Sequence, residues 1–264
     1  MKKIFLAILL LNALGCSKDN SSQKLLEDVL ASQRDGLPSA IQILELLQMP
    51  TDGYATISSY ATLAIQNFRG PEIMIRGFGY SKANAKSNFG ALTFGNISTN
   101  VNAGFDYSSV GAPGAKDLFG TTTSVALSGA SNLTGFSTNF YIPKLMTVTS
   151  PAFSNNSVIS PGTTITWEPD ANNTTFGVGI AISFDPNSPE NHHLNLSGSI
   201  TKNYIRTEDT GSYTISSNDL AGIPTDATLS LIIGRGNYKR QAMPNDYYFG
   251  LVAFSVIEHV FVRQ

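Results

Sequence analysis

The sequence has a single cysteine, Cys16, and charged residues make up only 14% of its 264 positions. One cysteine excludes an intramolecular disulfide and a cysteine-based zinc site. The few basic residues are scattered, and the one local cluster, Arg235, Lys239 and Arg240, is too small to follow a phosphate backbone. We therefore expect no nucleic-acid partner, and we expect this cluster to lie at a solvated hairpin tip.

Common signatures of enzymes are also missing. The chain contains no Gly-x-Ser-x-Gly, His-Glu-x-x-His or P-loop pattern. A Ser-x-x-Lys match at residues 21–24 has no companion motif and is attributed to chance. The Gly-x-Gly pairs at residues 77–79 and 234–236 lack a third glycine and a following helix, so we expect turns or bulges there. The sequence thus predicts no enzymatic activity, no catalytic residue and no cofactor.

The residues that are abundant favour a β protein. Hydrophobic residues make up 42% of the chain, enough for one large core or two modest ones. Gly, Ser, Thr and Asn are frequent, which suits short strands joined by many turns. We predict a mainly β, antiparallel fold with two β-sandwich-like domains and a short helical segment near the mature N-terminus.

The N-terminus has the layout of an export signal. Lys2 and Lys3 precede an apolar run at residues 4–11, and small or apolar residues lead up to Cys16. This run is shorter than the roughly 20 residues of a membrane-spanning helix. We therefore predict a signal peptide over residues 1–15 and a polar tether over residues 16–23.

These residues resemble the signal of bacterial lipoproteins, in which the cysteine is acylated and becomes the new N-terminus. Ser17, Lys18 and Asp19 resemble the short export tag of Bacteroidota surface lipoproteins. The resemblance implies lipidation at Cys16, attachment to the outer membrane and exposure on the cell surface. Anchoring that faces the periplasm is the alternative.

A first β domain is expected over residues 24–143. Its leading part, residues 24–48, has apolar residues at helical spacing, although a strand is also possible around residue 43, and its apolar stripe is expected to pack on the first sheet. Strand-like runs follow at residues 55–68, 72–80, 89–102, 121–128 and 135–143.

The second domain is expected over residues 144–264. Large apolar residues alternate with small ones over residues 176–184, which puts one face of that strand in a core. Leu229, Leu231 and Ile233 repeat the pattern. In the last strand the large apolar residues occupy even-numbered positions up to Val256 and odd-numbered positions after it. This change of face predicts a bulge or bend.

This domain resembles fibronectin type III and immunoglobulin-like domains. Trp167 in a Thr-Ile-Thr-Trp-Glu-Pro run resembles the core tryptophan of type III modules, and the run from Asp209 to Tyr213 resembles the Asp-x-Gly-x-Tyr corner of immunoglobulin folds. The resemblance implies a scaffold and no reaction. The whole layout resembles uncharacterised surface lipoproteins of Bacteroidota.

Three groups of residues are candidates for chemistry. The loop at residues 185–193 has two carboxylates and two imidazoles, and we expect a solvated loop, with calcium binding as the alternative. The carboxylates that could act on a glycosidic bond are Glu72, Asp106, Glu168 and Asp170. The tyrosines that could stack on sugar rings are Tyr238, Tyr247 and Tyr248. No metal site is predicted.

These observations together predict a lipid-anchored, non-enzymatic surface module for binding, adhesion or structure, with a glycan or protein ligand. Two alternatives stay open. One is an extracellular hydrolase that acts on glycan or peptide through carboxylates. The other is a structural subunit of the envelope that docks on a partner by strand addition.

Overall fold

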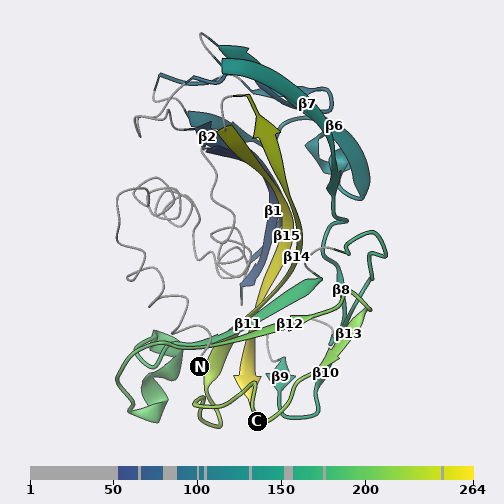
Figure 1. Ribbon diagram of the computed structural model, residues 1–264. Helices are drawn as coiled ribbons and strands as arrows, with labels where there is room; N and C mark the ends of the chain where they lie inside the picture. Colours follow the sequence, from purple (N-terminus) through teal and green to yellow (C-terminus); the bar gives the residue numbers. More distant parts are fainter. Residues whose placement is uncertain are drawn as a thin grey trace.

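Three β-sheets make up the described part of the chain (Figure 1). The computed structural model describes residues 53–64, 67–79, 88–99, 101–103, 106–130, 133–151, 157–174, 177–244 and 247–264. Cys16 and the segments predicted as signal peptide, export tag, tether and helix lie outside these residues. The prediction of a mainly β fold with antiparallel sheets is confirmed.

The largest sheet has eight strands and is ordered around one long hairpin. The hairpin strands are β14 (Thr228–Met243) and β15 (Tyr247–Arg263). The path of the sheet runs through β12 (Thr201–Thr207), β11 (Val178–Phe184), β14, β15, β1 (Gly53–Ala64), β2 (Asn67–Gly79) and β5 (Asp106–Val110), while β9 (Val158–Ile159) also pairs with β15. All neighbours are antiparallel except β1 and β9, which run parallel to β15.

Two smaller sheets lie on the same side of this large sheet, one toward each end (Figure 1). The four-stranded sheet has the order β4 (Ile97–Thr99), β3 (Leu92–Phe94), β6 (Thr121–Ala130) and β7 (Leu133–Ile142). The three-stranded sheet has the order β13 (Ser212–Thr214), β10 (Thr164–Trp167) and β8 (Val148–Ser150). Short 3-10 helices form at η1 (Ala115–Leu118) and η2 (Pro189–Leu194).

Each small sheet closes its own hydrophobic core against the hairpin. Core 1 joins the four-stranded sheet to Phe249, Leu251 and Ala253 of β15. Core 2 joins the three-stranded sheet to odd-numbered residues at the other end of the hairpin, among them Leu231 and Phe261. The alternation predicted for residues 176–184 is confirmed over residues 178–184, because Val178, Ile180, Ile182 and Phe184 all lie in core 2, whereas Phe176 lies outside the described residues.

The predicted bulge in the last strand is wrong. β14 and β15 pair without interruption from Thr228 opposite Val262 to Met243 opposite Tyr247. The apolar residues change from even-numbered to odd-numbered positions because both faces of β15 are apolar over part of its length. Odd-numbered residues enter the two cores, whereas Val252, Phe254 and Val256 form a separate buried cluster on the opposite face.

The two Gly-x-Gly pairs are not turns or bulges either. Gly77 and Gly79 take part in the regular ladder between β1 and β2, and Gly234 and Gly236 lie opposite Val256 and Phe254 inside the hairpin. Glycine often indicates a turn, but within a strand it can also mark a place where another part of the protein lies close to the backbone. In the described part of the chain, no helix is long and apolar enough to cross a membrane.

Candidate functional site

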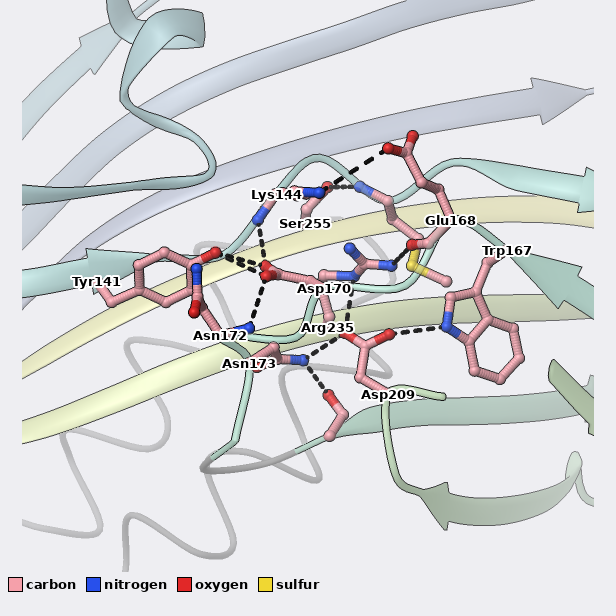
Figure 2. A network of polar contacts seen from close by, with 12 residues as sticks. Tyr141, Lys144, Trp167, Glu168, Asp170, Asn172, Asn173, Asp209, Arg235 and Ser255 are labelled. Atoms are coloured by element: carbon pink, nitrogen blue, oxygen red, sulfur yellow. Dashed lines mark hydrogen bonds and ion pairs between the residues drawn. The ribbon is translucent and has the colours of Figure 1, made fainter. Parts of the chain in front are cut away.

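A polar row crosses the large sheet between the two cores. Arg235 of β14 lies opposite Ser255 of β15, which in turn lies opposite Ser59 of β1. All three side chains are buried, with exposed fractions of 0%, 2% and 1%. We call this row, together with the residues that bond to it, the seam (Figure 2).

The seam contains a fully buried cation. Arg235 Nε lies 3.3 Å from Asp209 Oδ2, and the Asp209 side chain is only 2% exposed. The guanidinium also donates to the backbone oxygen of Glu168. Burial lowers the pKa of Arg235, while the charges of Asp209 and Asp170 act in the opposite direction. A buried charge of this kind is tolerated only because a paired anion offsets its desolvation.

Asp209 connects features that are far apart in the sequence. Its Oδ1 accepts a hydrogen bond of 2.8 Å from Trp167 Nε1, and its Oδ2 accepts one of 2.9 Å from Asn173 Nδ2 (Figure 2). The core tryptophan and the aspartate that opens the predicted corner are therefore in direct contact. Trp167 is buried in core 2, as predicted. Tyr213 of the same corner donates to Asp219 at 2.9 Å.

Asp170 is the second buried carboxylate of the seam. Tyr141 donates to both of its oxygens, at 2.7 and 2.8 Å. The backbone amides of Lys144 and Asn172 donate to it at 2.8 and 3.1 Å. Burial and the bond to Asp170 both raise the pKa of Tyr141, because they favour its neutral form. Asp170 thus ties β7 of the first small sheet to the loop after β10.

The linker between the small sheets crosses the hairpin at the same place. The amide of Met146 donates to Ser255 Oγ at 2.7 Å, and Asn237 Nδ2 donates to the backbone oxygen of Tyr141 at 2.8 Å. Lys239 reaches Thr138 Oγ1 at 2.6 Å on β7. These contacts join the hairpin to β7 of the four-stranded sheet and to the linker that follows it.

The predicted solvated tip is therefore wrong for Arg235. It is the largest fully buried side chain of the described residues, and Lys239 is partly buried against β7. Only Arg240 is exposed, and its guanidinium carbon lies 3.3 Å from the ring centroid of Tyr248. Charge in a sequence usually predicts exposure, and the partner that makes burial possible is remote in the chain.

A groove opens on the outer side of the seam. It has a volume of about 650 Å³ and lies between the loop that follows β10 and the end of β12. Its polar lining includes Asp170, Asn173, Arg206, Glu208, Asp209 and Thr210. Arg206 and Glu208 are exposed at the rim, whereas Asp170 and Asp209 lie at the back and are held by the seam. The rigid back of the groove is thus built from buried hydrogen bonds.

One polar atom beside this groove lacks a partner. Asn173 is 5% exposed and uses its amide nitrogen for Gly177 and Asp209. Its Oδ1 is buried and accepts no hydrogen bond within the described part of the chain. A buried acceptor without a donor costs about 1–3 kcal/mol, so this position reduces the stability of the loop that carries it.

Of the four carboxylates singled out in the sequence, one lines the groove. Asp170 lines it, whereas Glu168 is exposed nearby and forms a loose ion pair with Lys144 at 3.9 Å. The side chains of Glu72 and Asp106 lie outside what the structure describes. Sequence reasoning missed Arg206 and Glu208, although they lie within three residues of Asp209 of the corner motif.

The loop at residues 185–193 folds around its own backbone. Asp185 Oδ1 accepts from the amide of Asn187 at 2.9 Å. The two ring nitrogens of His193 lie 3.0 and 3.2 Å from the backbone oxygens of Glu190 and Asp226. His192 is exposed. Across the described residues, no three His, Cys, Asp or Glu side chains come together as a metal site.

The tyrosines proposed for stacking lie on the hairpin. Tyr238 is partly buried beside the cluster on the far face of the sheet, and burial raises its pKa to about 12. Tyr248 is partly buried under Arg240. The side chain of Tyr247 is not among those described. Their use in ligand binding stays a prediction.

Comparison with known proteins adds no relative from which a function could be transferred. A scan against protein-family models finds no match, and a search of curated proteins finds no significant similarity.

Proposed function

We propose that the mature protein is a lipid-anchored surface module that binds a polar ligand, a glycan in the first place, in the groove beside the seam. The single observation that carries the proposal is the groove itself, with its rigid back and polar rim. Carbohydrate hydroxyls both donate and accept hydrogen bonds. Glu208 offers an acceptor, while Arg206 and Thr210 offer donors.

The location of the groove also supports a binding role. Its walls come from loops at the margins of the sheets, and a scaffold that carries variable loops is a common basis for recognition. The buried bonds of Asp209 and Asp170 hold these loops before a ligand arrives. A preorganised site loses less conformational entropy on binding.

The proposal includes an immunoglobulin-like architecture for residues 144–264. Two packed sheets support it, with β13, β10 and β8 on one side and β12, β11, β14, β15 and β9 on the other. Their strand order agrees with that of immunoglobulin-type sandwiches. The contact between Trp167 and Asp209 links the two sequence features on which the resemblance depends. The division into two sandwich domains near residue 144 stays part of this proposal.

The anchor is proposed from the sequence alone. Cys16 would be lipidated, and Ser17, Lys18 and Asp19 would direct the protein to the outer face of the outer membrane. Protease shaving of intact cells, combined with the intact mass of the mature N-terminus, tests both parts. A lipidated Cys16 and cleavage by external protease are expected; an unmodified cysteine or a fully protected chain contradicts the surface location.

Binding is tested on an array of neutral and acidic oligosaccharides with the mature chain carrying Cys16→Ser. Arg206→Ala and Glu208→Ala change the rim without touching the buried bonds of the seam, and each is expected to weaken binding about tenfold, as for one lost polar contact. Lys202→Ala and Glu190→Ala remove exposed charges elsewhere and serve as matched controls. Absence of glycan binding, or binding that the rim variants leave unchanged, contradicts the proposal.

A carboxylate hydrolase is the second candidate, because Asp170 and Asp209 both line the groove. Both carboxylates already accept several protein hydrogen bonds, which favours a positioning role over proton transfer. Product analysis of every oligosaccharide that binds separates the two candidates. Cleavage that Asp170→Asn abolishes, in a variant that still binds, would favour the hydrolase.

A further inference from the structure

The three-stranded sheet turns one face to core 2 and the other face outward (Figure 1). Ile165 and Trp167 of β10 enter core 2. Thr164 and Thr166 alternate with them and therefore point outward. Their partners on β13 and their neighbour on β8 are also threonine or serine. We call the outward residues of this sheet the hydroxyl face: Thr149, Thr164, Thr166, Ser212 and Thr214.

Mutual hydrogen bonds order the side chains of the hydroxyl face. Thr164 Oγ1 lies 2.9 Å from Thr214 Oγ1. Thr149 Oγ1 lies 2.8 Å from Thr166 Oγ1. A hydroxyl has one donor and two acceptor lone pairs, so a pair with one mutual bond can still donate and accept toward a ligand. All residues of the face except Thr166 are exposed, and none is charged. The face therefore offers ordered donors and acceptors without charge.

The hydroxyl face begins where the groove ends. Thr210 lines the groove, and Ser212 follows two residues later, at most about 7 Å along the chain. The amide of Trp167 donates to the backbone oxygen of Gly211 at 2.9 Å, which holds this turn against the end of β10. A groove of about 650 Å³ has the size of a small-molecule site. A longer ligand must therefore continue over the surface beside it.

We propose that the groove and the hydroxyl face together bind a linear, uncharged polysaccharide. One segment of the polymer lies in the groove, and the sugars that follow it lie across the hydroxyl face. The inference rests on the glycan site of the proposed function and names the class of glycan. Sugar hydroxyls donate and accept as the threonines do, whereas an acidic polymer would meet no cation among the residues of the face.

The length of the ligand is the property that the hydroxyl face should select. A single hydrogen bond to a sugar replaces one to water and contributes little to affinity. Several such bonds add up only when one ligand is long enough to reach the face from the groove. A short oligosaccharide should therefore bind through the groove alone, and a longer one should bind more tightly.

Titration calorimetry with oligosaccharides of increasing length tests the proposal in the mature chain with Cys16→Ser. The probes are the cello-, malto- and xylo-oligosaccharides, from the disaccharide to the octasaccharide. Thr164→Val with Thr214→Val removes one hydroxyl pair, keeps the shape of both side chains and leaves neither partner unpaired. Ser124→Ala with Ser137→Ala removes an exposed hydroxyl pair of the four-stranded sheet and is the matched control.

We expect the association constant to rise at least about tenfold from the disaccharide to the octasaccharide in one of the series. The valine pair should remove most of this rise and leave binding of the disaccharide unchanged, whereas the alanine pair should preserve the rise. Equal affinity at every length, or a rise that the valine pair preserves, overturns the polymer site but leaves the groove as a site for short glycans. Binding of acidic oligosaccharides alone also overturns it. Absence of all glycan binding contradicts the groove, and this inference with it.

Discussion

The two ends of the β14–β15 hairpin are alike, whereas its middle is different. At one end Leu229, Leu231 and Ile233 enter core 2, and at the other Phe249 and Leu251 enter core 1. Between them the same face of the sheet carries Arg235 and Ser255. The backbone ladder is continuous, so the interruption exists only in the side chains.

This contrast teaches how two cores can share one sheet. Apolar packing tolerates alternative arrangements of similar volume, whereas buried ion pairs and hydrogen bonds require particular partners. The seam therefore sets where each small sheet lies along the hairpin. We propose that the groove depends on this setting, because Asp170 and Asp209 belong to both.

The largest expected effect comes from removing the anion of the seam. Asp209→Asn removes the carboxylate that forms the ion pair with the buried Arg235 and should lower the free energy of unfolding by about 3–5 kcal/mol. Urea denaturation measures the change. Glu168→Gln, which removes the exposed partner of Lys144, is the control and should cost less than about 1 kcal/mol. Equal effects of the two substitutions would contradict a special role for the seam.

A backbone position behind the groove should come next. Gly177 has a φ of +67°, and an added Cβ would lie 2.2 Å from the backbone oxygen of Thr207. Gly177→Ala should therefore lower the free energy of unfolding by about 1–3 kcal/mol and weaken ligand binding. Gly162 also has a positive φ, +94°, but an added Cβ there would have no neighbour within 4 Å. Gly162→Ala therefore measures the cost of the backbone conformation without a steric clash. If both substitutions cost the same, the contact with Thr207 is unimportant.

The bond between β7 and the loop after β10 should have a moderate effect. Tyr141→Phe removes the hydroxyl that donates to Asp170 and should cost about 1–2 kcal/mol at neutral pH. The pKa of Tyr141 is raised above its ordinary 10.0, so the unfolded chain loses this proton first as the pH rises. The contribution of the Tyr141 hydroxyl to stability should therefore be constant below about pH 10 and fall above it, and the fall in this range should be shallower in Tyr141→Phe. A steeper fall would contradict the assignment.

The smallest effect is expected at the exposed part of β14. Arg240→Ala removes only the contact over the ring of Tyr248 and should cost about 0.5–1 kcal/mol. Thermal unfolding of Arg240→Ala and of Asp209→Asn compares the loss of stability at an exposed charge of β14 with the loss at the buried ion pair of Arg235 on the same strand. A loss at Arg240 as large as that at Asp209 would remove the distinction between the seam and the hairpin surface.

Much of the fold could be predicted from local pattern. The alternation at residues 178–184 directly indicates a strand with one buried face, and Trp167 in an apolar strand indicates a core position. The strands of the four-stranded sheet also show in the sequence, except that β3 and β4 were expected as one run. Such signals depend only on neighbouring residues.

The seam could not be predicted in the same way. Arg235 lies among glycines and basic residues, which suggests a solvated turn, and nothing near it in sequence announces Asp209 as its partner. The change of apolar face along β15 was wrongly taken to indicate a bulge, because a strand that is buried on both faces has no single apolar side. Pairing between distant residues decides both features.

Unfolding followed by one probe in each core tests the shared sheet most directly. Trp167 is the only tryptophan, and its fluorescence reports core 2. Pulsed hydrogen exchange of β6 and β7 reports the four-stranded sheet that closes core 1. We predict the same urea midpoint for both probes, because the hairpin and the seam couple the cores into one cooperative unit. Two separate midpoints would show that the cores unfold independently and would contradict this account.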